Sequence, residues 1–293
     1  MTKTTRFIQT AAIGALGILL VVPVLAQAPP PPLPPGELDR LVDRIALYPD
    51  PLLSQVLAAA TYSDQIPDAA RWADEHHYLT GQALADAIQE DHLPWDPSVQ
   101  ALLPFPSVLD MMASDMNWTS QLGNAFLSQQ QDVMDAVQRE RHKAYDFGYL
   151  RTNAQIVVTP GPYIAIAPFN PGFIVVPYYD PAVVFFAPRA GFFVGGAIHF
   201  GFGVTIGGFF RPWGWGFNRF DWAHHEVFIN NAPWHRTWAT RGTYVHPYTV
   251  PRYQGARPAE RHELIRRSPR EREAQRRGEA TREEHRGGGH ERR

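Results

Sequence analysis

The stretch that decides the fold is ELDRLVDRIALYPDPLL, residues 37–53. Its first apolar residues follow the i, i+3, i+4, i+7, i+8 spacing of one helix face: Leu38, Leu41, Val42, Ile45 and Ala46. Charged residues lie between them, a pattern typical of a helix packed on a core. The turn at Tyr48-Pro49-Asp50-Pro51 ends this helix. Asp50 is predicted to cap the next helix, with Pro51 at its first position.

The helical pattern continues to about residue 151. Further helices are expected from Leu52, from Ala69 to His77, after Thr80 and after Asp96-Pro97. A capping pair is expected at the start of another helix, formed by Ser107 and Asp110. The longest helix is predicted to run from about Trp118 to about Tyr145.

After residue 155 the pattern becomes that of short strands. β-branched and aromatic runs occupy residues 156–159, 163–167, 173–178 and 183–187, and turns rich in Pro, Gly and Asp separate them. Short strands at this spacing predict an antiparallel meander. We therefore predict an α+β protein in which an acidic helical N-terminal domain precedes the meander and a Gly/aromatic-rich segment, with a disordered C-terminal tail.

Charge divides the chain at the same places. Acidic and basic side chains number 18 and 7 in residues 27–155, 3 and 5 in residues 156–251, and 8 and 13 in residues 252–293. The predicted organisation is a signal peptide (1–26), a Pro-rich spacer (27–36), a helical domain (37–151), a β-rich and Gly/aromatic part (155–250) and a disordered Arg/Glu tail (252–293). The chain has no Cys, which excludes disulfides, thiolate metal sites and a Cys nucleophile.

The N-terminus has the three parts of a secretory signal peptide. Lys3 and Arg6 are basic, an apolar run follows from Ala11 to Val22, and small or modest residues precede a cut after Ala26. We expect cleavage near Ala26 and a periplasmic or secreted protein. The alternative is an uncleaved anchor, for which the apolar run is short.

Several motifs resemble a known family. IALYPDPLL (45–53) is similar to the opening signature of exported bacterial proteins that share domain of unknown function number 3300. The resemblance continues in QVLAAATY (55–62), WDPSV (95–99) and VPYYDP (176–181), and covers roughly residues 37–230. It implies an exported bacterial protein. The family has no established activity or assigned site residues, so no catalytic role is carried over.

The densest titratable cluster is a weak metal-site candidate. It consists of His224, His225 and Glu226, with His235 and His246 downstream and His199 upstream. Imidazoles and a carboxylate can bind zinc or copper, but adjacent residues of a strand point to opposite faces. Surface or packing roles are the preferred interpretation, and no metal or other cofactor is predicted.

The sequence contains no catalytic motif that we recognise. It lacks Gly-x-Ser-x-Gly and a phosphate-binding Gly loop. Helix capping and turn formation explain the three Asp-Pro acids, Asp50, Asp96 and Asp180. The seryl residues in helical contexts are explained by capping or exposure, and they are Ser54, Ser63, Ser107 and Ser114.

Two segments point to contacts with other molecules. Residues 191–210 are apolar and Gly-rich, and they predict soluble strands or loops, with a membrane-inserted helix or peripheral membrane contact as the alternative. The aromatic side chains that follow form either a contact surface for a partner or the core of the sheet, and they are Trp213, Trp215, Phe217, Trp222 and Trp234. Export argues against nucleic acid as a partner of the basic tail, despite its charge.

We therefore expect an exported protein of unknown biochemical activity, most plainly a non-enzymatic interaction or scaffold protein of the bacterial cell envelope. Its partner would be an envelope protein or polymer. The alternatives are an envelope hydrolase with a composite site and a His-based metal-binding module. The oligomeric state does not follow from the sequence.

Overall fold

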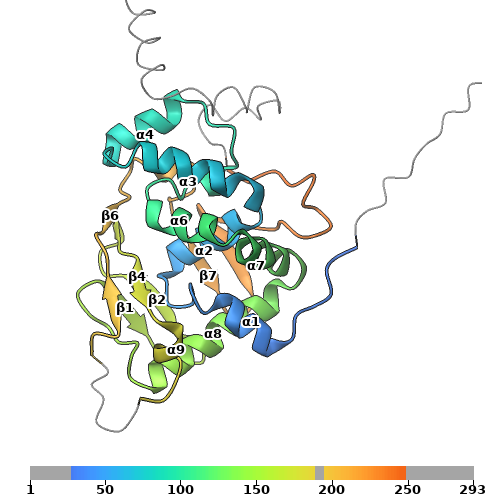
Figure 1. Ribbon diagram of the computed structural model, residues 1–293, viewed down its shortest axis with the longest axis vertical. Coiled ribbons are helices and arrows are strands. Elements are labelled where there is room, and N and C mark those ends of the chain that lie inside the picture. The colour runs from blue at the N-terminus through green and yellow to red at the C-terminus, as the bar shows by residue number, and fades with distance from the viewer. Residues whose placement is uncertain (1–27, 189–194, 249–293) are drawn as a thin grey trace, which may run out of the picture.

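The computed structural model describes residues 28–188 and 195–248 (Figure 1). The predicted signal peptide and Arg/Glu tail lie outside these residues. The helical part contains α1 (Pro35–Val42), α2 (Asp50–Ala60), α3 (Ile66–Glu75), α4 (Gly81–Glu90), α5 (Pro97–Gln100), α6 (Pro106–Ser114), α7 (Met116–Ser128) and α8 (Gln130–Asp146). Short antiparallel strands follow, so the α+β prediction is confirmed. No helix among the described residues is long and apolar enough to cross a membrane.

The single long helix predicted from Trp118 to Tyr145 is wrong, because the chain breaks between α7 and α8. The backbone of Gln129 leaves the helical region, with φ −145° and ψ 52°. Its side-chain oxygen accepts a hydrogen bond from the amide of Leu33 at 2.8 Å, and its Nε2 donates to the Leu33 carbonyl at 3.3 Å. The helix therefore breaks at the residue that bonds Leu33, which lies 96 positions earlier in the chain.

The capping pair predicted at Ser107 and Asp110 is also wrong. Helix α6 begins at Pro106 without a side-chain cap. The Ser107 hydroxyl instead accepts a hydrogen bond from the hydroxyl of Tyr178 at 2.8 Å. This bond links the helical part to a strand 71 residues later in the chain.

Within the described residues the strands pair antiparallel, as predicted, but they form four separate small sheets instead of one meander. Strands β1 (Ile156–Thr159) and β2 (Ala165–Pro168) form a hairpin, and the last sheet follows the order β7 (Arg219–Asp221), β8 (Glu226–Ile229) and β9 (Ala232–Pro233). Between them, β3 (Phe173–Ile174) pairs with β6 (Val204–Thr205), and β4 (Pro177–Tyr179) pairs with β5 (Ile198–Phe200). Described residues 195–210 therefore complete sheets begun earlier in the chain.

The strand expected at 183–187 is a short helix instead. Helix α9 (Pro181–Val184) starts after Asp180, whose Oδ1 accepts from the amide of Ala182 at 2.9 Å. The capping role predicted for Asp180 is thus confirmed. The fixed φ of Pro181 suits the first turn of a helix and overrides the β preference of the valines that follow.

One hydrophobic core joins the helices to the late strands. The Trp213 Nε1 donates to the Oε1 of Gln100 at 3.0 Å, and the Trp215 Nε1 donates to the Ala101 carbonyl at 2.9 Å. Trp222 and Trp234 are also buried. Of the two alternatives that the sequence leaves open for these tryptophans, the core is therefore confirmed and the contact surface is wrong. Phe217 alone of the predicted set is exposed, at 58%.

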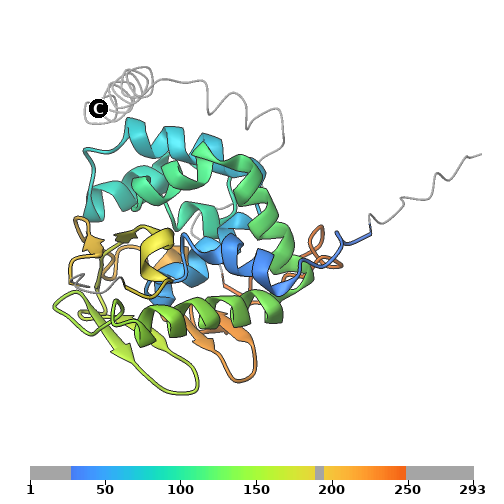
Figure 2. The same cartoon turned by 60° about the horizontal axis from the view of Figure 1, so that its bottom comes forward.

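The two hairpins rest on α8 from the same side (Figure 2). Gln138 of α8 exchanges hydrogen bonds with the backbone of Ile164, which lies just before β2. Gln130 of α8 donates to the carbonyl of His225, in the turn before β8. Helix α8 thus positions the β1–β2 hairpin and the β7–β8 turn relative to the helical part.

Candidate functional site

The structure does not bring the predicted metal-site candidates together. His224 pairs with Asp221 in its own turn, at 2.9 Å from Nδ1 to Oδ2. His225 points to α8, where its Nε2 lies 2.8 Å from Oδ1 of Asp135. Glu226 is exposed. His199 and His235 are exposed as well. Within residues 28–188 and 195–248, no three His, Cys, Asp or Glu side chains converge as a metal site would require.

Asp50 is not the helix cap that the sequence predicts. It lies inside the first turn of α2, after the true N-cap Pro49, and makes no capping hydrogen bond. Its Oδ1 instead accepts from Nη1 of the fully buried Arg141 at 2.6 Å. Burial raises the pKa of the Asp50 carboxyl, and the Arg141 charge opposes this rise. Asp50 therefore serves as the counter-ion of a buried guanidinium.

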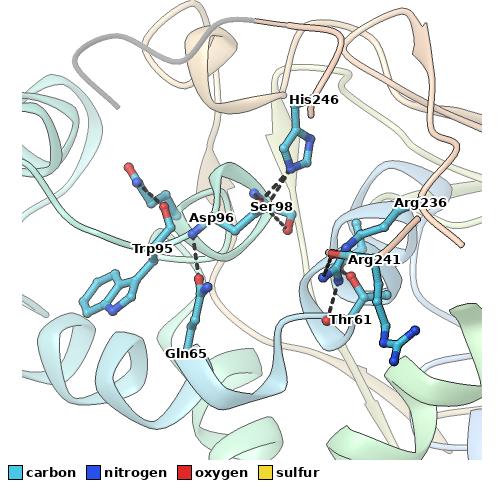
Figure 3. A network of polar contacts seen from close by, with 10 residues as sticks. Thr61, Gln65, Trp95, Asp96, Ser98, Arg236, Arg241 and His246 are labelled. Atoms are coloured by element: carbon cyan, nitrogen blue, oxygen red, sulfur yellow. Dashed lines mark hydrogen bonds and ion pairs between the residues drawn. The ribbon is translucent and has the colours of Figure 1, made fainter. Parts of the chain in front are cut away.

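Asp96 does cap its helix, and it also forms a buried polar centre with a residue from the end of the described chain. Its Oδ1 accepts from the amide of Ser98 at 2.9 Å and from the Ser98 hydroxyl at 2.7 Å. The Nε2 of His246 lies 2.8 Å from Oδ1 and 2.9 Å from Oδ2 (Figure 3). The side chains of Asp96 and His246 are only 7% and 8% exposed. We call these three residues the Asp96–His246 centre.

The chain segment that delivers His246 is fastened along its length. This segment, residues 234–248, is named the strap. Trp234 stacks on Phe126 with ring centroids 4.9 Å apart. The Nη1 of Arg236 donates to the Thr61 carbonyl at 2.5 Å, and the guanidinium lies 3.7 Å from the centroid of the Tyr62 ring. The strap thereby closes over α2 and the loop before α5.

The tyrosines around the Asp96 carboxylate have raised pKa values because they are buried. Burial and the charge of Asp96 raise the pKa of both Tyr62 and Tyr248, so these phenols stay neutral. Burial also raises the pKa of Tyr244 to about 12. The Nδ1 of His246 is buried without a hydrogen-bond partner.

The geometry of the Asp96–His246 centre suits holding the strap to the start of α5 better than it suits hydrolysis. Ser98 is completely buried and its hydroxyl donates to Asp96, so it does not present a nucleophile to an outside substrate. A nucleophilic seryl would instead donate to a base and face a site where the reacting atom can sit. Asp96 and His246 were each visible in the sequence, but no signal linked them across 150 positions.

An open groove lies between the turn after α3, helix α4 and strand β6, which neighbour each other in Figure 1. It consists of two adjoining hollows of about 340 Å³ and 510 Å³. Both hollows are lined by Leu79, Thr80, Leu84, Pro104, Gly203 and Val204. Their aromatic lining comes from Phe105, Tyr178, Phe202, Phe209 and Phe210. We call this surface the aromatic groove.

Several rings of the aromatic groove face solvent. Phe202 is fully exposed, Tyr178 is 45% exposed and Phe209 is 39% exposed. Glycines let the backbone approach the rings. A Cβ at Gly201 would lie 2.7 Å from the Tyr178 ring, and one at Gly203 would lie 2.0 Å from the neighbouring Phe173 ring. Large side chains at these two positions would displace the rings.

The aromatic groove is also neutral. Within the described part of the chain, no Asp, Glu, Lys or Arg lines either hollow, although the helical part is strongly acidic. The polar lining comes from hydroxyls and amides, with His76 and His77 at one end. An apolar surface with few hydrogen-bonding groups is what a binding groove for an uncharged ligand requires. The sequence pattern does not reveal this surface, because its residues come from α3, α4, α6, β4, β6 and the loops beside them.

The fold and the groove define an α+β protein, and comparison with known proteins places the chain in a family whose function is unknown. Residues 35–251 match the family described as "Protein of unknown function (DUF3300)", and the chain belongs to this family. It is also 34% identical over 183 residues to "Uncharacterized protein YacH" of Escherichia coli (strain K12). That similarity covers 51% of this chain and 29% of the relative, so the chain spans under a third of YacH. No solved structure matches the chain.

Proposed function

We propose that this protein is an exported, non-enzymatic interaction or scaffold protein of the bacterial cell envelope, and that the aromatic groove is its contact surface. The observation that carries the proposal is the exposure of three rings, Tyr178, Phe202 and Phe209, around a neutral groove. Aromatic side chains are enriched and charged ones depleted in the centres of protein interfaces. The buried tryptophans do not contribute, since they belong to the core.

We prefer binding over catalysis because the buried acidic side chains already have partners inside the protein. The Asp96 carboxylate is bound by Ser98 and His246 inside the protein. The carboxyl of Asp50 is held by Arg141, and burial, which the Arg141 charge opposes, explains its raised pKa without a reaction. Perturbed carboxyls in ion pairs are as much a structural as a catalytic feature.

Site-specific photo-crosslinking tests the contact surface. A photoreactive amino acid placed at Phe202 should capture a partner in the producing cell. The same group placed at Phe186 should not, although Phe186 is 62% exposed outside the lining of the groove. Identical adducts from both positions, or none from Phe202, would contradict the proposal.

Export is tested separately by the mass of the mature chain. The basic, apolar and small-residue order of the first 26 residues predicts a product beginning at Gln27 in the periplasmic fraction or the medium. A chain that keeps Met1 in the cytoplasmic fraction would overturn the envelope assignment and leave the binding surface to be judged by crosslinking.

A further inference from the structure

We propose that the aromatic groove of one molecule binds the prolines at the N-terminal edge of a second copy, Pro29 to Pro32. This inference rests on the function proposed above, because it names the occupant of the same surface. It follows from the chemistry of the two surfaces and from their positions on the molecule.

The proline segment is exposed and held at its base. Pro29, Pro31 and Pro32 are exposed, and Leu33 is fixed by two hydrogen bonds with Gln129. Pro34 has φ −70° and ψ 158°, close to polyproline II geometry. Proline lacks an N–H, so a run in this geometry displays carbonyl acceptors and apolar rings while losing little entropy on binding.

The aromatic groove offers what such a segment needs. Proline-rich segments dock in grooves lined by aromatic rings, and Tyr178, Phe202 and Phe209 provide exposed rings here. The Ser107 hydroxyl lines the groove and accepts from Tyr178, so its own proton is left to donate to a ligand carbonyl. Residues 27–36 carry no charged side chain, and neither does the lining of the groove apart from its His residues.

The positions of the two surfaces favour contact between copies rather than within one. The described start of the proline segment leaves α1 on the side away from β6, and Figures 1 and 2 agree on this. Four residues in polyproline II geometry span only about 12 Å. Contact between two different surfaces is heterologous, so it builds open chains of molecules unless a ring closes.

A peptide titration tests the inference on the full chain. The peptide APPPPLPPG, residues 28–36, is titrated by calorimetry into the wild type and into two variants. Saturable binding is expected for the wild type and for Phe186→Ser. Binding to Phe202→Ser should be about tenfold weaker or lost, because a central ring carries much of the energy of such a contact. Both substituted rings are exposed, so both variants should fold.

Two further measurements decide the outcome. Sedimentation of the wild type should show a mass that rises with concentration, and Pro30→Ser with Pro31→Ser should reduce this rise. No peptide binding by the wild type, or equal binding by Phe202→Ser, would overturn self-association. Crosslinking from Phe202 to a different protein without peptide binding would overturn this inference alone. Absence of any adduct from Phe202 would overturn the contact surface itself.

Discussion

Arg141 organises the turn that the family signature encodes. Its side chain is fully buried in α8 and donates to three carbonyls, those of Ala46, Tyr48 and Ile164, at 2.8–2.9 Å. Its fourth bond, to Asp50, balances the charge. The guanidinium also lies 4.9 Å from the ring centroid of Trp222. One side chain thus ties the Ala46 and Tyr48 carbonyls and the Asp50 carboxylate together at the YPDP turn, which the sequence describes only as a helix boundary.

The ion pair predicts how Asp50 tolerates substitution. Both Asp50→Ala and Asp50→Asn should lower the free energy of unfolding, each by about 3–5 kcal/mol, because either leaves the Arg141 charge buried without a counter-ion. Urea unfolding measures the loss. At the true cap Asp180, by contrast, Asn should be tolerated and Ala should cost about 0.5–2 kcal/mol. A wild-type stability for Asp50→Asn would show that capping, rather than charge, matters at residue 50.

His224 is expected to titrate above its ordinary pKa. The hydrogen bond and the charge of Asp221 raise the pKa of His224, and the same contact lowers the pKa of Asp221. The pair therefore stabilises the fold fully between the ordinary pKa values of Asp and His; this contribution is lost as pH rises through the folded pKa of His224 or falls through that of Asp221. NMR titration should show the elevated pKa and its return toward the ordinary value in Asp221→Asn. An unchanged value in that variant would refute the pairing.

At the scale of elements, sequence pattern predicts helices wherever one face is continuously apolar. The helices expected near Leu38, Leu52 and Ala69 and after Thr80 are found close to the expected residues. The pattern fails where a contact with a distant residue determines the helix boundary. The helix breaks at Gln129, and the side chain of Gln129 bonds the backbone of Leu33. The pattern also fails for strand order, because β3 and β4 pair with strands about 20–30 residues later.

Close packing of α7 on α2 predicts an inverted effect of a glycine substitution. Gly123 lies in the interior of α7, where alanine would raise helix propensity by up to about 1 kcal/mol. A Cβ at Gly123 would lie 2.0 Å from the carbonyl oxygen of Ala60, which belongs to the backbone of α2. Gly123→Ala should therefore destabilise the protein, by about 1–3 kcal/mol or more.

The matched control for this prediction is Gly36→Ala. A Cβ at Gly36, in the first turn of α1, would have no atom within 4 Å. This substitution should leave the unfolding midpoint unchanged or slightly raised. If thermal melting shows Gly123→Ala to be as stable as Gly36→Ala, the two helices are not packed as closely as described.

At the scale of the whole molecule, residues distant in the sequence meet in one core. Trp213 and Trp215 reach Gln100 and Ala101, and Trp234 reaches Phe126. The sequence predicts that these rings are either core or contact surface, because both uses need large apolar side chains. The packing of the late chain against α5 and α7 decides for the core. The Asp96–His246 centre escaped prediction for the same reason, since its partners are 150 positions apart.

The strap predicts two different results of shortening the chain. Ending the chain after Pro251 keeps the strap and removes residues 252–293, which carry 13 Arg and 8 Glu and few large apolar side chains. The free energy of unfolding should then change by less than about 1 kcal/mol. Ending the chain after Asn231 removes Trp234, which is 2% exposed, together with Arg236 and His246.

The chain that ends at Asn231 should lose more than about 3 kcal/mol of its free energy of unfolding, the usual cost of removing one buried tryptophan. The point variant Trp234→Ala should reproduce most of that loss without shortening the chain. Urea unfolding of the three proteins, followed by far-UV circular dichroism, compares them directly. A chain ending at Pro251 that is as unstable as the one ending at Asn231 would show that stability depends on the tail. An equally stable Asn231 truncation would show that the strap fastens nothing, because the core would then be complete without Trp234.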